Sequence, residues 1–116
     1  MTRYRVEFDG VITDDDDDQK IVKDPEVVQG IVDRILLELT KLASMNPQVA
    51  GQPDDGGLTV SVDIEESEMF MASLAGFTQI RTAVHAADIG TPGWKVEWVR
   101  TTTVAPGRRL SEGVPA

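Results

Sequence analysis

Hydrophobic and polar residues alternate along three segments of the chain, and two segments with helical spacing lie between them. Residues 3–12, 58–65 and 94–103 show the period of two that is typical of half-buried strands, with β-branched and aromatic side chains on one side. Residues 25–44 and 67–88 carry apolar side chains at intervals of three and four, which predicts two amphipathic helices. The predicted order begins and ends with a strand.

The first predicted helix, 25–44, has recognisable start and stop signals. Asp24 suits the N-cap because its carboxylate can accept the free backbone N–H groups of the first turn. Pro25 suits the first helical position, where its missing N–H costs nothing. The pair Asn46 and Pro47 predicts the end of the helix, since the residue before a proline avoids helical backbone angles.

The second predicted helix, 67–88, begins at Ser67 and ends before Gly90 and Pro92. Gly76 is its weak position, because glycine disfavours a helix interior, and a close approach to the sheet would account for it. Met69 and Met71, together with Phe70, form a candidate adaptable contact at the helix start. The expected apolar stripe consists of Phe70, Leu74, Phe77, Ile80, Ala83, Val84 and Ala87.

Residues 48–52 are the weakest predicted element, because Val49 is the side chain there that can pack. The turn cluster at 53–57 predicts a hairpin that joins this segment to 58–65. With that strand, the fold class is α+β, a ferredoxin-like βαββαβ two-layer sandwich with both helices on one face of the sheet. Without it, the alternative is a three-stranded βαβαβ layer, and the sequence leaves both open.

One domain, residues 1–105, contains all of these elements, and a polar tail follows at 106–116. The apolar content of 41% is ordinary for a globular protein, so the chain can build a core without disulfides. The expected core combines the apolar sides of the strands and helices. It consists of Tyr4, Val6, Phe8, Ile31, Ile35, Leu39, Leu58, Val60, Val62, Ile64, Leu74, Phe77 and Val84.

The net charge of −9, from 20 acidic and 11 basic residues, repels the phosphates of nucleic acids and of anionic membranes. RNA recognition on an open sheet face also needs aromatic side chains there, and the outward positions of the two central strands hold none. We therefore expect neither a nucleic-acid partner nor a membrane partner. The outward residues are Arg3, Arg5, Glu7, Asp9, Thr59, Ser61, Asp63 and Glu65.

No recognisable motif for catalysis, metal binding or cofactor binding is present. The acidic run 14–18 does not match a calcium loop, because the sixth and twelfth positions from Asp14 hold Gln19 and Pro25 instead of glycine and glutamate. His85 is the one histidine, and it has no cysteine or second histidine to complete a metal site. We expect no enzyme activity, no cofactor and no metal, and we interpret 14–18 as a solvated loop.

Trp94 and Trp98 share a face with Val96, and packing against the second helix is the simpler interpretation of both. An indole at the sheet edge would instead anchor an interface, because Trp is enriched at binding hot spots. Residues 99–104 form a β-prone edge with few charges, and the outward arginines can pair with a second copy. The candidate interface residues are Trp94, Trp98, Val99, Arg3 and Arg5.

Three classes of function stay open. We expect first a non-catalytic, acidic protein–protein interaction module whose partner is another protein or a second copy of itself, as a homodimer formed through the sheet. The alternatives are an acidic inhibitor or nucleic-acid mimic that binds a basic partner protein, and a small enzyme with a pocket between subunits. The chain has no cysteine and no recognisable signal peptide, so we expect a cytoplasmic location.

The isolated protein should not bind DNA or RNA at physiological salt, because its net charge of −9 opposes phosphate contacts. Fluorescence anisotropy of labelled single-stranded and duplex oligonucleotides should stay constant up to micromolar protein. Saturable binding that weakens as salt is added would contradict this expectation.

Overall fold

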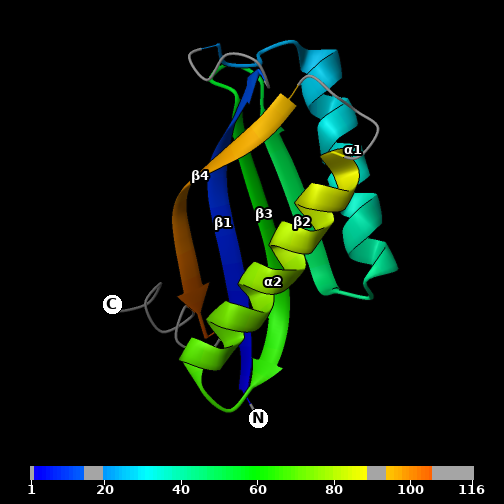
Figure 1. The fold of residues 1–116 in the computed structure, drawn as a ribbon. Helices are drawn as coiled ribbons and strands as arrows, with labels where there is room; N and C mark the ends of the chain where they lie inside the picture. Colours follow the sequence, from blue (N-terminus) through cyan, green and yellow to red (C-terminus); the bar gives the residue numbers. More distant parts are fainter. Residues whose placement is uncertain (1, 15–19, 89–93, 106–116) are drawn as a thin grey trace.

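A computed structural model of the protein describes residues 2–14, 20–88 and 94–105. The four strands form one antiparallel sheet in the order β2-β3-β1-β4, and both helices lie on the same face of it (Figure 1). The protein is therefore α+β, and its element order fits the predicted βαββαβ. The elements are β1 (Thr2–Asp14), α1 (Pro25–Lys41), β2 (Met45–Gln52), β3 (Gly57–Glu66), α2 (Met69–Asp88) and β4 (Trp94–Val104).

The central strands β1 and β3 bring the predicted apolar positions together on the face that the helices cover. Val6 lies opposite Val62 and Phe8 opposite Val60 in the register of the pair, and all four side chains are buried. The segment expected at 48–52 is a full edge strand, β2, paired with β3. The three-stranded alternative is therefore excluded.

Helix α1 begins as its sequence predicts. The Asp24 carboxylate accepts the backbone N–H of Glu26 at 2.9 Å, and Pro25 occupies the first turn. Its buried side chains come from the predicted apolar stripe, and Ile35 and Leu39 are fully buried.

The predicted end of α1 is wrong. The helix stops at Lys41, and the backbone turns out of it at Ala43, whose φ is 57°. Asn46 and Pro47, expected to end the helix, lie within β2, where the register with β3 shifts. Proline is tolerated there because β2 is an edge strand, in which a missing N–H need not remove a sheet hydrogen bond.

Helix α2 presents most of the predicted stripe to the sheet, since Ile80, Ala83 and Ala87 are fully buried. The exceptions lie at its start, where Phe70 is 69% exposed. Leu74, expected in the core, is 46% exposed, and Phe77 and Val84 are half-buried. An alanine-sized Cβ placed on Gly76 would lie 2.6 Å from Cβ of Val6, which shows how closely the helix approaches β1. Small residues allow this approach, and the exposed large side chains lie near the start of the helix, at Phe70 and Leu74. The buried stripe is Ala72, Gly76, Ile80, Ala83 and Ala87.

Glycine interrupts the apolar–polar alternation of β1 at Gly10, and the structure has a bulge in the sheet there while β1 itself continues to Asp14. The register between β1 and β4 shifts at this point, because Asp9 lies opposite Arg100 whereas Gly10 lies opposite Trp98. Val99 is thus the additional residue of a bulge in β4. A Cβ on Gly10 would lie 2.8 Å from the Trp98 ring, so glycine makes room for the indole.

Residues 20–22 lie alongside the end of β1, where Ile21 forms an isolated antiparallel bridge with Thr13. The backbone N–H of Asp14 donates to the carbonyl of Lys20 at 2.8 Å, and that of Val22 donates to the carbonyl of Ile12 at 2.9 Å. The acidic positions 15–18, the predicted stop of the second helix at Gly90 and Pro92, and the tail 106–116 lie outside the described residues.

The variant Gly76→Ala should destabilise the protein by roughly 1–3 kcal/mol, because the added methyl group overlaps Val6 across the closest helix–sheet contact. Gly30→Ala in α1 is the matched control. A Cβ there would meet nothing within 4 Å, so the better helix former should stabilise the protein by about 0.5–1 kcal/mol. Urea unfolding of both variants, followed by tryptophan fluorescence, measures the difference. Equal stabilisation by the two variants would contradict the close contact.

Candidate functional site

The first turns of α2 expose four large apolar side chains, which we call the α2 patch: Met69, Phe70, Met71 and Leu74. Phe70 is 69% exposed, Leu74 is 46% exposed and the two methionines are each 44% exposed. A cluster of this kind is typical of an interaction site, whereas single exposed apolar residues need no explanation. The patch includes the contact expected at the helix start and adds Leu74 to it.

The α2 patch lies beside the last part of β4. The hydroxyl groups of Ser73 and Thr103 are 2.7 Å apart and join the first half of the helix to the second half of the strand. Figure 1 shows the same arrangement, with the start of α2 next to the end of β4. An apolar surface and a sheet edge are therefore neighbours.

Strand β4 forms one edge of the sheet. Within the described ranges it pairs with β1 on one side, so the backbone groups on its other side have no partner strand. Such an edge pairs readily with another strand unless charges or proline block it. Residues 99–104 contain one charged side chain, Arg100, whose Nε lies 3.3 Å from an Asp9 carboxylate oxygen. The opposite edge, β2, contains Pro47.

The bulge places Val99 outside the regular alternation of β4, and its side chain is 71% exposed. The other apolar candidates on this strand are less exposed. Trp94 is buried in the core, and Trp98 is half-buried with its ring edge-on to Phe8 at a centroid distance of 5.6 Å. The structure therefore places the two tryptophans mainly in the packing between β4, β1 and α2.

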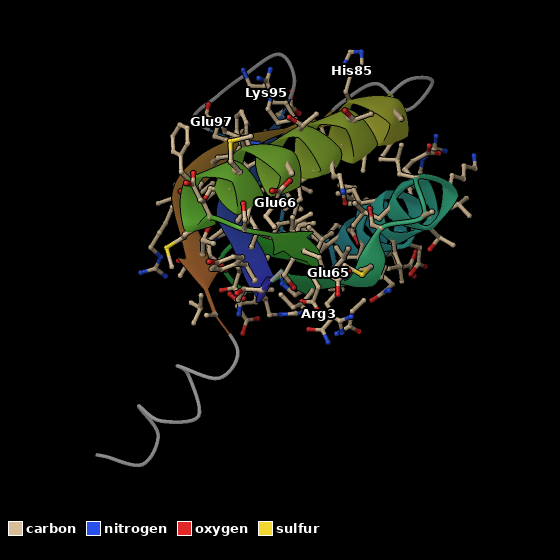
Figure 2. All side chains as sticks on the ribbon, turned by 90° about the horizontal axis from the view of Figure 1, so that it is seen from below. Arg3, Glu65, Glu66, His85, Lys95 and Glu97 are labelled. Carbon is tan, nitrogen blue, oxygen red and sulfur yellow. The ribbon has the colours of Figure 1, made fainter. Side chains whose placement is uncertain are left out.

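The arginines proposed for the interface form ion pairs within the chain, on the sheet face without helices. Arg3 lies 3.3 Å from a Glu65 carboxylate oxygen, and the two project from the side of the molecule opposite His85 on α2 (Figure 2). Arg5 pairs with Asp63, two register positions along and on the same face of the sheet.

The second of these pairs is part of a larger cluster. Arg5 also donates to the Ser61 hydroxyl at 2.9 Å, and the Asn46 side-chain amide donates to the other oxygen of Asp63 at 3.2 Å. The Asp63 side chain is 8% exposed, so this carboxylate is buried although it lies on the open face. The positive φ of Asn46, 48°, belongs to the irregular part of β2 that supplies this donor.

The sequence predicts the exposure of the α2 patch through the spacing of small residues in α2, although the spacing of large apolar residues does not. Ala72, Gly76, Ala83 and Ala87 recur with helical spacing, and a stripe of small residues is the one that a sheet can approach most closely. Counting large side chains instead placed Leu74 in the core.

Three further findings concern metal binding, membrane spans and similarity to known proteins. Among the described residues, no group of three or more His, Asp or Glu side chains is arranged to hold a metal ion. In the part of the chain that the structure describes, no helix is long and apolar enough to cross a membrane. Comparisons with protein-family models, curated proteins and solved structures found no significant match.

The variant Asp63→Ala should destabilise the protein by about 2–3 kcal/mol, because it leaves Arg5 and Asn46 without their shared acceptor. Glu65→Ala removes the neighbouring exposed ion pair and should cost less than about 1 kcal/mol. Chemical unfolding at neutral pH compares the two. A loss for Asp63→Ala as small as that for Glu65→Ala would show that the buried cluster does not stabilise the sheet.

Proposed function

We propose that the protein is a non-catalytic protein–protein interaction module and that its partner is a second copy of the same chain. In the proposed homodimer, the β4 edges of two copies pair antiparallel, and the α2 patch of each copy packs against that of the other. The observation that carries the proposal is the position of the exposed α2 patch directly beside the unpaired edge of β4. A ferredoxin-like two-layer sandwich is part of the same proposal, supported by the strand order β2-β3-β1-β4.

Two-fold symmetry explains why both features occur at one edge. An axis perpendicular to the sheet sets β4 against β4 of the second copy and continues the sheet across both chains. Since α2 lies on one face and adjoins β4, the same rotation brings the two α2 helices side by side. Backbone hydrogen bonds and apolar contacts then form together, so neither needs to hold the dimer alone.

The charges along β4 permit this pairing. If the axis passes at Thr102, Thr101 lies opposite Thr103 of the second copy and Arg100 lies opposite its Val104. No like charges then meet across the edge, and Arg100 is already paired with Asp9 in its own chain. The remaining opposition is the net charge of −9 on each chain, which salt screens. We therefore expect the dimer to persist or tighten as salt rises from low to physiological.

The edge is a better interface than the open sheet face. Homodimer formation through the sheet was expected to use Arg3 and Arg5, but both arginines already form ion pairs with Glu65 and Asp63 of their own chain. The charges of both arginines are therefore compensated within one chain. The side chains of the α2 patch, by contrast, are not buried by any of the described residues.

Sedimentation velocity at physiological salt should show dimer at about 100 µM protein, an affinity in the range of modest homodimers. The double variant Phe70→Glu, Leu74→Glu should weaken association by at least about tenfold, because it places charges in the proposed apolar contact. Leu37→Glu in α1 is the matched control, since this leucine is also large, apolar and 53% exposed but belongs to the other helix. It should leave the dimer unchanged.

Monomer alone at the highest concentration would remove the homodimer and leave a different protein as the partner of the α2 patch. Dissociation by Leu37→Glu, with no effect of the α2 variant, would move the interface to α1. Far-ultraviolet circular dichroism and thermal unfolding of each variant separate lost association from lost folding.

A further inference from the structure

A second surface feature lies between the second half of α2 and the first half of β4. It is an open hollow of about 310 Å³, near the lower limit of pockets that bind small molecules. Trp94, Val96 and Trp98 supply its apolar wall on the strand side, and Arg81, His85 and Lys95 supply its basic groups. The combination of indole rings and cations in one hollow points to an aromatic anion as the ligand.

The two basic residues of α2 are available to a ligand. Arg81 and His85 are one helical turn apart and exposed, and neither side chain makes a hydrogen bond or an ion pair with any residue in 2–14, 20–88 or 94–105. The guanidinium carbon of Arg81 lies 5.1 Å from the centre of the Phe77 ring. This cation–π contact holds the group in place and leaves its N–H donors exposed.

The far wall contributes a third basic side chain. Lys95 lines the hollow, and Figure 2 shows it projecting from the same side of the molecule as His85. Because Lys95 also interacts elsewhere in the chain, Arg81 and His85 are the better hydrogen-bond donors to an anion. The acidic residue closest to Lys95 along β4 is Glu97, which is exposed and does not line the hollow.

Basic side chains gather in this hollow although the whole molecule is acidic. The chain has a net charge of −9 with 11 lysines and arginines, yet Arg81, His85 and Lys95 are the ionisable side chains among the described residues that line the hollow. The hollow on the open sheet face, by contrast, is lined by Asp9 and Asp55 as well as Arg100. An anion is therefore attracted to the α2–β4 hollow and not to the other one.

We propose that this hollow binds a small planar carboxylate. Its aromatic ring lies against the exposed part of Trp98, and its carboxylate accepts hydrogen bonds from Arg81 and His85. Arginine suits this contact because its planar guanidinium matches the two oxygens of a carboxylate. The site is independent of the proposed homodimer, since it uses the parts of α2 and β4 on the other side of the Val99 bulge.

An NMR titration tests the proposal with biphenyl carboxylate as the probe and neutral biphenyl carboxamide as its matched control. The chain has two tryptophans, both in this hollow, so the indole N–H resonances report binding directly. The carboxylate should shift the Trp98 indole resonance in a saturable way, and the carboxamide should bind about fivefold more weakly or worse.

Variants connect the signal to Arg81 and His85. Arg81→Gln and His85→Gln should each weaken binding of the carboxylate about three- to fivefold, whereas Arg81→Lys should retain part of the affinity because it keeps the charge. Arg100→Gln is the control, since it removes an equal charge from the open sheet face.

Three outcomes would overturn the site. They are equal binding of the carboxylate and the carboxamide, no shift of either indole up to about 10 mM probe, and equal weakening by Arg81→Gln and Arg100→Gln. The last result would show a general charge effect and no specific contact. The same titration in the double variant Phe70→Glu, Leu74→Glu should give unchanged affinity, so a failure of the homodimer does not affect this test.

Discussion

The contact between Gly76 of α2 and Val6 of β1 is the constraint on which the functional surfaces depend. No side chain larger than glycine fits there without displacing Val6, so the helix must turn its small residues toward the sheet. This contact fixes the rotation of the helix about its axis. The side of the helix opposite the sheet therefore carries Phe70 and Leu74. Exposed apolar residues at the start of α2 are therefore a consequence of close packing at its centre.

The bulge in β4 has a comparable effect on the edge of the sheet. Before Val99, the strand directs Trp94, Val96 and Trp98 toward α2 and forms one wall of the basic hollow. After Val99, it continues as a polar, nearly uncharged edge beside the α2 patch. One strand thus contributes to two surfaces of different chemistry, and the bulge separates them.

Local signals predicted much of the fold. Strict alternation identified the central strands, and Asp24 with Pro25 marked the start of α1, because both signals depend on near neighbours. Asn46 and Pro47 gave a wrong prediction for the end of α1. Both residues fit within β2 because it is an edge strand, which is a property of the whole sheet. Leu74 was misplaced because the apolar period does not weigh side-chain size. Arg81 and Trp98 come together only through the packing of α2 on β4, which no local pattern encodes.

Hydrogen exchange of the β4 backbone amides, measured at several protein concentrations, tests whether β4 pairs with β4 of a second copy. In an isolated chain, the amides of 99–104 that point away from β1 pair with no strand of the described residues and should exchange quickly. These amides should gain protection as the protein concentration rises, and Phe70→Glu with Leu74→Glu should abolish the gain. A dimer that forms while these amides continue to exchange quickly would contradict this pairing.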